Sequence, residues 1–117
     1  MADEEFIETS FLIPLHEDKE IGNGRLHPSD RWSKFKKKLY DNFKAWTLAP
    51  GHYKGCYRDP NTGEIVIDLS RKFILAVSEN DMERLKGFLK EEGAVFKQKF
   101  IYFVARGKVE LLEARYE

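Results

Sequence analysis

The sequence predicts an α+β fold, in which two helices cover one face of an antiparallel sheet. Three observations lead to this prediction. Apolar and polar residues alternate along several segments, as they do in half-buried strands. Two other segments repeat apolar residues every three or four positions, as amphipathic helices do. A strong turn signal at residues 59–64 joins two of the strand-like segments into a hairpin.

The first part of the chain is predicted to form a strand, a polar loop and a helix. Residues 5–17 alternate between apolar and polar side chains and are predicted to be a strand, and residues 17–27 are the loop. The helix is predicted to begin at Pro28 and Ser29. Asp30 then lies in its first turn, where the helix dipole favours a negative charge. The apolar stripe of this helix consists of Trp32, Phe35, Leu39 and Phe43.

The middle of the chain is predicted to form a β-hairpin. Its strands run over residues 52–58 and 64–77. Pro60 and Gly63 supply the backbone angles that the intervening turn requires. With a four-residue loop, the cross-strand pairs are Tyr57 with Val66, Gly55 with Asp68, and Tyr53 with Ser70.

The last part of the chain is predicted to add a second helix and a final strand. Ser78 and Asp81 have the spacing of a capping box at the start of the helix, and Gly93 is expected to end it. Residues 100–105 are the last strand, with residues 109–112 as a short continuation. The resulting order, β-α-β-β-α-β, is that of a ferredoxin-like fold, with two helices on one face of the sheet.

The length of 117 residues fits a single domain over residues 1–117, with residues 1–5 and 113–117 expected to fray. The charge-free stretch near the start is too short to span a membrane, and the first twenty residues hold seven acids and one base, unlike a secretory signal. We therefore expect a cytoplasmic protein with no membrane partner. The single cysteine, Cys56, excludes an intramolecular disulfide and is expected to be a small core residue.

The face of the sheet that the helices leave open is expected to meet solvent or a partner. Because that face carries a mixture of apolar and polar residues, we predict a homodimer formed through it. Residues 21–58 hold nine bases and two acids, which we interpret as a solvated helix face. Zero net charge argues against a nucleic-acid partner.

The candidate site residues gather on the hairpin. Tyr57, Asp68 and Ser70 share the open face, and Asp68 costs free energy in an apolar strand unless it is paired or solvated. The alternative for these residues is a dimer interface or a wet sheet surface. Arg71 interrupts the apolar face of the same strand, where we expect it to form an ion pair with a carboxylate or to meet a phosphate. His16 ends the first strand and completes the predicted ligand-binding set, for which a small anionic ligand is expected.

The sequence carries no recognisable catalytic, nucleotide-binding or metal motif. The three histidines are scattered, so neither a metal nor a cofactor is expected, and catalysis is left open. One alternative is a cofactor-independent enzyme of the dimeric α+β barrel type, in which His16, Tyr57 or Asp68 acts as acid or base. A less favoured alternative is nucleic-acid binding through aromatic residues of the sheet: Tyr53, Tyr57 and Tyr102.

Several short motifs resemble a family of small bacterial domains of unknown function. The motifs are Gly55-x-Tyr57-Arg58-Asp59, Asn61-Thr62-Gly63-Glu64, Asp68-x-Ser70-Arg71 and Phe96-x-Gln98-x-x-x-Tyr102. The resemblance covers roughly residues 10–105. It implies a ferredoxin-like or dimeric α+β barrel-like fold, and it implies no activity.

Overall fold

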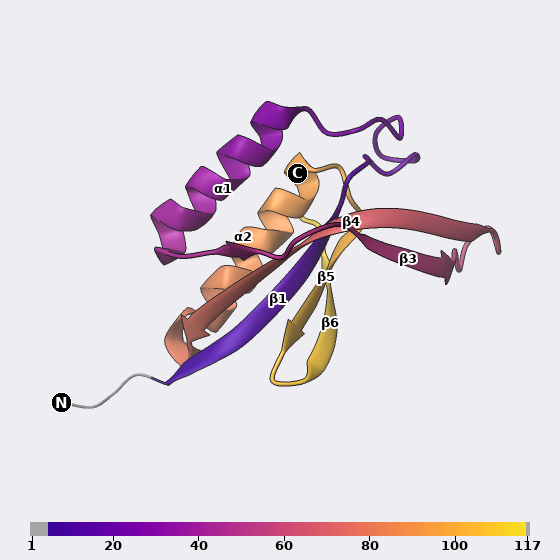
Figure 1. Cartoon of the computed structure of the whole chain (residues 1–117). Helices are drawn as coiled ribbons and strands as arrows, with labels where there is room; N and C mark the ends of the chain where they lie inside the picture. The colour runs from indigo at the N-terminus through magenta and orange to yellow at the C-terminus, as the bar shows by residue number, and fades with distance from the viewer. Residues whose placement is uncertain (1–4, 117) are drawn as a thin grey trace.

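The structure of the protein is a computed structural model that describes residues 5–116 (Figure 1). The fraying predicted for residues 1–4 and 117 falls outside these described residues. The elements follow in the order β1 (Phe6–Pro14), α1 (Ser29–Phe43), β2 (Thr47–Leu48), β3 (Tyr53–Arg58), β4 (Ile65–Ser78), a 3-10 turn (Glu79–Asp81), α2 (Met82–Val95), β5 (Phe100–Ala105) and β6 (Lys108–Glu113).

The strands form one six-stranded antiparallel sheet, and Figure 1 shows both helices on the same side of it. The predicted α+β class is therefore confirmed. The strand order is β2-β4-β1-β5-β6, with β3 paired to β4 outside this path. The sheet differs from the predicted β-α-β-β-α-β order by two additional strands. Strand β2 was not predicted, and β6 was expected only as a continuation of the strand before it.

The separate strand β6 arises from the two-residue turn that precedes it. Arg106 and Gly107 both have positive φ angles, 53° and 71°, as the tight turn of a hairpin requires. The chain therefore reverses, and β6 pairs antiparallel with β5. The prediction that residues 109–112 continue the strand was wrong for this reason.

The predicted hairpin register is confirmed. Strand β3 pairs with β4 so that Tyr57 lies opposite Val66 and Gly55 opposite Asp68, and the Asp59 N–H donates to the Glu64 carbonyl at 2.8 Å. The pairing of β1 with β4 ends near Ser70, so residues 65–68 of β4 pair with β3 alone. We call this two-stranded extension, β3 with residues 65–68, the arm. Figure 1 shows it projecting from the body of the molecule.

The core lies between the sheet and the two helices. Alternate residues of β1 and β4 are buried there, and the stripe predicted for α1 is buried except for Phe43, which is half-buried. Phenylalanine rings fill the centre, and Phe11 stacks on Phe73 with 5.6 Å between ring centroids. Leu85 and Leu89 of α2 complete this core.

Two expectations about small residues were wrong. Gly93 does not end α2, which continues to Val95. A Cβ built on Gly93 would lie 3.1 Å from the Ala114 Cβ, so glycine is required there by close packing. Cys56 is exposed because it lies on the arm, which projects beyond the two helices.

The end of the described chain, within the range expected to fray, is hydrogen-bonded to the body. The backbone N–H groups of Ala114 and Arg115 donate to Lys99 and Lys90. The Tyr116 hydroxyl donates to the Gln98 carbonyl at 2.5 Å. Neither helix within residues 5–116 is long and apolar enough to cross a membrane.

Candidate ligand-binding site on the open sheet face

We call the side of the sheet away from α1 and α2 the open face. Phe73 and Leu75 of β4 point to the helices and are buried, so the alternate β4 residues Asp68 and Ser70 lie on the open face. The register of the hairpin puts three residues of β3 on the same face: Tyr53, Gly55 and Tyr57. The predicted grouping of Tyr57, Asp68 and Ser70 therefore agrees with the strand pairing.

Asp68 lies directly over Gly55. A Cβ built on Gly55 would approach the Asp68 Oδ1 to 3.0 Å, so glycine makes room for this carboxylate. Asp68 is half-buried, and burial alone raises its pKa above the ordinary value of 3.8. No described residue offers this carboxylate a compensating hydrogen bond or ion pair. Its negative charge is therefore available to a ligand.

Several charged groups act on the Tyr57 phenol. Burial raises the pKa of the Tyr57 phenol above 10.0, and the negative charges of Asp68, Asp18 and Asp59 raise it further, while Lys99 has the opposite effect. Three carboxylates and one ammonium group therefore lie close enough to this phenol to act on it. We call Asp18, Tyr57, Asp59, Asp68 and Lys99 the acidic cluster.

Several groups of the acidic cluster already have partners. Lys99 forms an ion pair with Glu20 at 2.6 Å, and this contact, ahead of smaller effects, raises the lysine pKa. The Asp59 carboxylate accepts the Asn61 N–H at 2.8 Å, which lowers its pKa and holds the hairpin turn. The Asp18 carboxylate accepts the Glu20 N–H at 2.8 Å. Asp68 is the charged member of the cluster without such a partner among the described residues.

A buried ion cluster fixes the loop that carries Asp18. The Glu17 carboxylate is buried beside the guanidinium groups of Arg31, at 3.1 Å, and Arg25, at 3.4 Å. Burial by itself raises the Glu17 pKa, but hydrogen bonds from Arg31 and the Asn23 N–H and the charge of Lys97 outweigh it and lower the pKa to about 2. The loop is therefore held by a charged anchor.

His27 belongs to the same anchor. Its Nε2 lies 2.9 Å from the Pro14 carbonyl, so this nitrogen carries the proton and donates, and Nδ1 accepts from Arg31 at 3.0 Å. Burial, followed by the charge of Arg31, lowers the His27 pKa to about 4. The imidazole is therefore neutral at physiological pH and acts as a structural link between β1 and α1.

The remaining predicted residues occupy three different surroundings. Ser70 is buried on the open face, opposite Tyr53 on one side and Pro14 on the other. His16 is exposed and forms an isolated bridge with Leu26. No hydrogen bond or ion pair joins His16 to Asp68 among residues 5–116.

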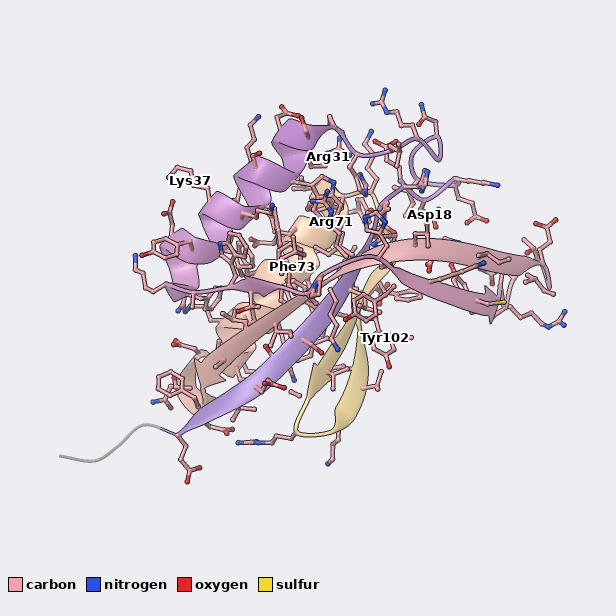
Figure 2. The ribbon with its side chains drawn as sticks, viewed as in Figure 1. Asp18, Arg31, Lys37, Arg71, Phe73 and Tyr102 are labelled. Carbon is pink, nitrogen blue, oxygen red and sulfur yellow. The ribbon has the colours of Figure 1, made fainter. Side chains whose placement is uncertain are left out.

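Arg71 lies on the helix side of the sheet, away from Asp68 and Tyr57. Its guanidinium lies over the Trp32 ring, 4.3 Å from the centroid, and Figure 2 labels it beside Arg31. The expected ion pair is absent among residues 5–116. The cation–π contact takes its place because α1 presents an indole, and no carboxylate, to this part of β4.

Sequence reasoning missed Asp18 and Lys99. Asp18 lies in a loop and Lys99 just before β5, and they meet because the Asp18 N–H donates to the Lys97 carbonyl at 3.0 Å. No spacing in the sequence brings these positions together. The one available signal was the concentration of acids in residues 1–20.

No metal-holding group is found in the described part of the chain, and two pockets lie away from the acidic cluster. Residues 5–116 contain no set of three histidine, cysteine or acidic side chains arranged to hold a metal ion. Two shallow surface pockets, of about 330 and 200 Å³, lie elsewhere. The larger is next to Phe103 and Arg106, and the smaller lies between Arg31 and Glu92. Neither of these two pockets is lined by a member of the acidic cluster.

Comparisons with known proteins give a likeness of fold. No protein-family model and no curated protein matches the sequence. Two solved structures match the whole chain. One is a phage SAM lyase in complex with S-methyl-5′-thioadenosine, with a TM-score of 0.69 and 17% identity over 100% of this chain and 97% of that one. The other is a phage SAM lyase in the apo state, with a TM-score of 0.60 and 19% identity over 100% and 98%. At these identities the chain is similar in fold to the phage SAM lyases.

Proposed function

We propose that the acidic cluster binds a small organic cation and that this ligand is S-adenosylmethionine (SAM). The observation that carries the proposal is the unpartnered, half-buried carboxylate of Asp68, which acts on Tyr57 together with two other aspartates and one lysine. Such a site attracts a positive charge, so the ligand differs in sign from the anion expected from sequence. The sulfonium of SAM is a permanent cation, and carboxylates and tyrosine rings are the groups that stabilise one.

The likeness of fold supports the choice of SAM among organic cations. The similar proteins are named as SAM lyases, and one of them holds S-methyl-5′-thioadenosine. The open face also offers half-exposed aromatic side chains on which an adenine ring could stack: Tyr53, Tyr57 and Tyr102. Ser70 and His16 are proposed as polar neighbours of the bound ligand.

The test compares a charged ligand with an uncharged one. SAM and S-methyl-5′-thioadenosine are titrated separately by calorimetry against the wild type and Asp68→Asn. The substitution should weaken SAM binding about five- to tenfold, because one ion pair near a surface is worth roughly 1 kcal/mol, and leave the thioether within about twofold. Glu8→Gln removes an exposed acid from the other end of the open face and should change neither affinity. If the wild type binds neither ligand, the proposal is wrong.

A second candidate function is cleavage of SAM without a cofactor. S-methyl-5′-thioadenosine is the thioether that remains when the sulfonium sulfur of SAM loses its amino-acid chain, and it is bound to one of the proteins of similar fold. The test is chromatography of SAM incubated with the protein, against a blank without protein, because SAM also decomposes slowly by itself. Release of the thioether above the blank, reduced in Asp68→Asn, is the expected result; equal release in both is evidence against catalysis.

We also propose that the protein is a cytoplasmic homodimer that associates through the open face. Strands β5 and β6 expose apolar side chains there: Tyr102 is 39% exposed, and Val109 and Leu111 are 55% exposed. Half-buried Leu12 and Ile74 adjoin them. This is the kind of surface that a stable interface, burying about 800 Å² on each partner, would cover.

Light scattering of the eluting protein tests the homodimer. The wild type should have twice the chain mass at high micromolar concentration, and Leu111→Lys should have the mass of one chain. Val95→Lys, which changes an exposed residue on the helix side, should remain a dimer. A wild type that is monomeric at every concentration would contradict the proposal.

A further inference from the structure

Arg71 has an unusual position for an arginine. It is half-buried on the helix side of β4, and its guanidinium lies 4.3 Å from the centroid of the Trp32 ring. Trp32 itself is 5% exposed and is fixed by two further rings, with centroids 4.8 Å from Phe96 and 6.4 Å from Phe73. The guanidinium therefore lies on a rigid support, which lowers the entropy lost when it binds a ligand.

The donors of this guanidinium have no partner in the described chain. Among residues 5–116, no carboxylate lies within 4.0 Å of Arg71 and no hydrogen bond from its side chain is found. The neighbouring Arg31 differs, because it donates to Glu17 and His27. Half-buried arginines normally meet a carboxylate or phosphate through paired N–H groups. Arg71 thus presents that edge to a group from outside the described chain.

A second cation lies on the same face next to Arg71. Lys54 of β3 pairs with Leu69, two residues before Arg71 on β4, so the two cations are diagonal neighbours. Diagonal neighbours on a sheet lie about 7–8 Å apart at Cα, within reach of long side chains that converge on one ligand. Lys54 is exposed and has no ion pair within residues 5–116, and Leu69, between the two, is 38% exposed.

We propose that Arg71 and Lys54 form an oxyanion-binding site on the helix side of the sheet, which takes a phosphate or carboxylate group beside the Trp32 indole. Arg71 supplies paired N–H donors in a fixed plane, and Lys54 supplies a mobile charge that completes the coordination. This site lies on the opposite face of the sheet from the acidic cluster. It is independent of the proposed binding of SAM and takes a ligand of opposite charge.

The tryptophan under Arg71 provides the readout. The chain has two tryptophans, so Trp46→Phe leaves Trp32 as the only indole and serves as the reference protein. Inorganic phosphate and acetate are titrated separately into this protein at constant ionic strength maintained with chloride, and Trp32 fluorescence is recorded. A saturable change is expected with at least one of the two anions, and the tighter one identifies the class of oxyanion.

Variants of the two cations test whether they carry the binding. Arg71→Lys keeps the charge but loses the planar fork, and Lys54→Gln removes an exposed charge without disturbing the core; each should weaken binding about tenfold, the loss of one charge-assisted contact. Lys34→Gln changes an exposed lysine of α1; it is the matched control and should bind like the reference protein.

Near-ultraviolet circular dichroism establishes that the variants are folded. If Arg71→Lys is unfolded, the anion affinity of Lys54→Gln alone tests the proposal. A reference protein without a saturable response, or with a response that both cation variants retain, overturns the proposal.

Discussion

At the scale of single residues, the charged side chains fall into two groups. Some have a partner of opposite charge within the described chain, and others have none. Glu17 is buried among Arg25, Arg31 and Lys97 and acts as an anchor. Asp68 and Arg71 have no such partners among residues 5–116 and lie on opposite faces of one strand. Within four residues, β4 thus presents an anion on one face and a cation on the other.

Binding of SAM should depend on pH through Asp68. The raised pKa of this carboxyl means that it gains a proton at a higher pH than an exposed aspartate does. As the pH falls through this pKa, the negative charge is lost and SAM binding should weaken. The sulfonium charge does not titrate, so binding of the uncharged thioether should remain level over the same range. Titrations of both ligands from pH 7 downward, with Asp68→Asn as a variant without this titration, check the prediction.

Gly55 should be needed for the position of Asp68. In Gly55→Ala, the new methyl group lies 3.0 Å from Oδ1, so the carboxylate must move. We expect SAM affinity to fall with little change in the free energy of unfolding, because Gly55 lies in the arm and outside the core. Gly63→Ala is not a suitable control, because Gly63 has a φ of 73°; Lys54→Ala on the same strand is. Unchanged SAM affinity in Gly55→Ala would contradict this role.

Protonation of Glu17, the centre of the charged anchor, should make the protein less stable at low pH. The Glu17 pKa is lowered from 4.5 to about 2 in the folded protein, so the unfolded state binds the proton first. The contribution of Glu17 is fully present above about pH 4.5 and is lost as the pH falls toward 2. His27, lowered from 6.5 to about 4, contributes stability that is lost between these two values. Urea unfolding of wild type and Glu17→Gln should give stability curves that converge between pH 5 and 2; parallel curves would contradict the assignment.

At the scale of elements, sequence reasoning succeeded where one local signal determined the structure. Pro60 and Gly63 determine the hairpin turn, and the register of β3 with β4 follows from it. Sequence reasoning failed where the role of a residue depends on contacts with residues distant in the sequence. The sequence does not distinguish a glycine that ends a helix from one that packs closely, as Gly93 does against Ala114. Strand β2 is only two residues long, too short to show an alternation of apolar and polar residues. Asp18 and Lys99 meet only after the sheet has formed.

Two glycines of α2 should respond in opposite ways to alanine. Gly87 has open space where a Cβ would lie, so Gly87→Ala should stabilise the protein by about 0.5–1 kcal/mol through helix propensity. In Gly93→Ala, contacts of 3.1 Å to Ala114 and 3.3 Å to Ile101 should outweigh that gain and destabilise the protein by roughly 1–3 kcal/mol. Urea unfolding of the pair measures the difference. Equal stabilisation by both substitutions would show that the packing around Gly93 yields without cost.

At the scale of the whole molecule, the principal extents of 53 × 32 × 30 Å describe a body longer than it is wide, from which the arm projects. Both faces of the arm carry exposed large side chains: Ile65 and Ile67 on the helix side are 64% and 62% exposed, and Tyr57 on the open face is 43% exposed. An isolated two-stranded hairpin is marginally stable in water. The arm is therefore the part of the sheet that gains most from a covering partner.

Hydrogen exchange should report this difference. Backbone amides of the arm are expected to exchange much faster than those of β4 next to Phe73 and Leu75, because few buried contacts hold the arm. If copies of the chain associate over the arm as well as the open face, protection of the arm should rise with protein concentration. Equal protection of arm and core in a dilute monomer would contradict the description of the arm as weakly held.

The pairing of β1 also has a consequence for how the chain folds. Its two neighbours, β4 and β5, lie far along the sequence, and the Thr9 hydroxyl donates to the Leu75 carbonyl 66 positions away. Closing such long loops costs entropy before any contact repays it, so folding is expected to be slow for a chain of this size. During synthesis β1 is made long before its partners β4 and β5, and it cannot pair until they have left the ribosome. The two strands of the arm, in contrast, can pair as soon as the turn between them has been made.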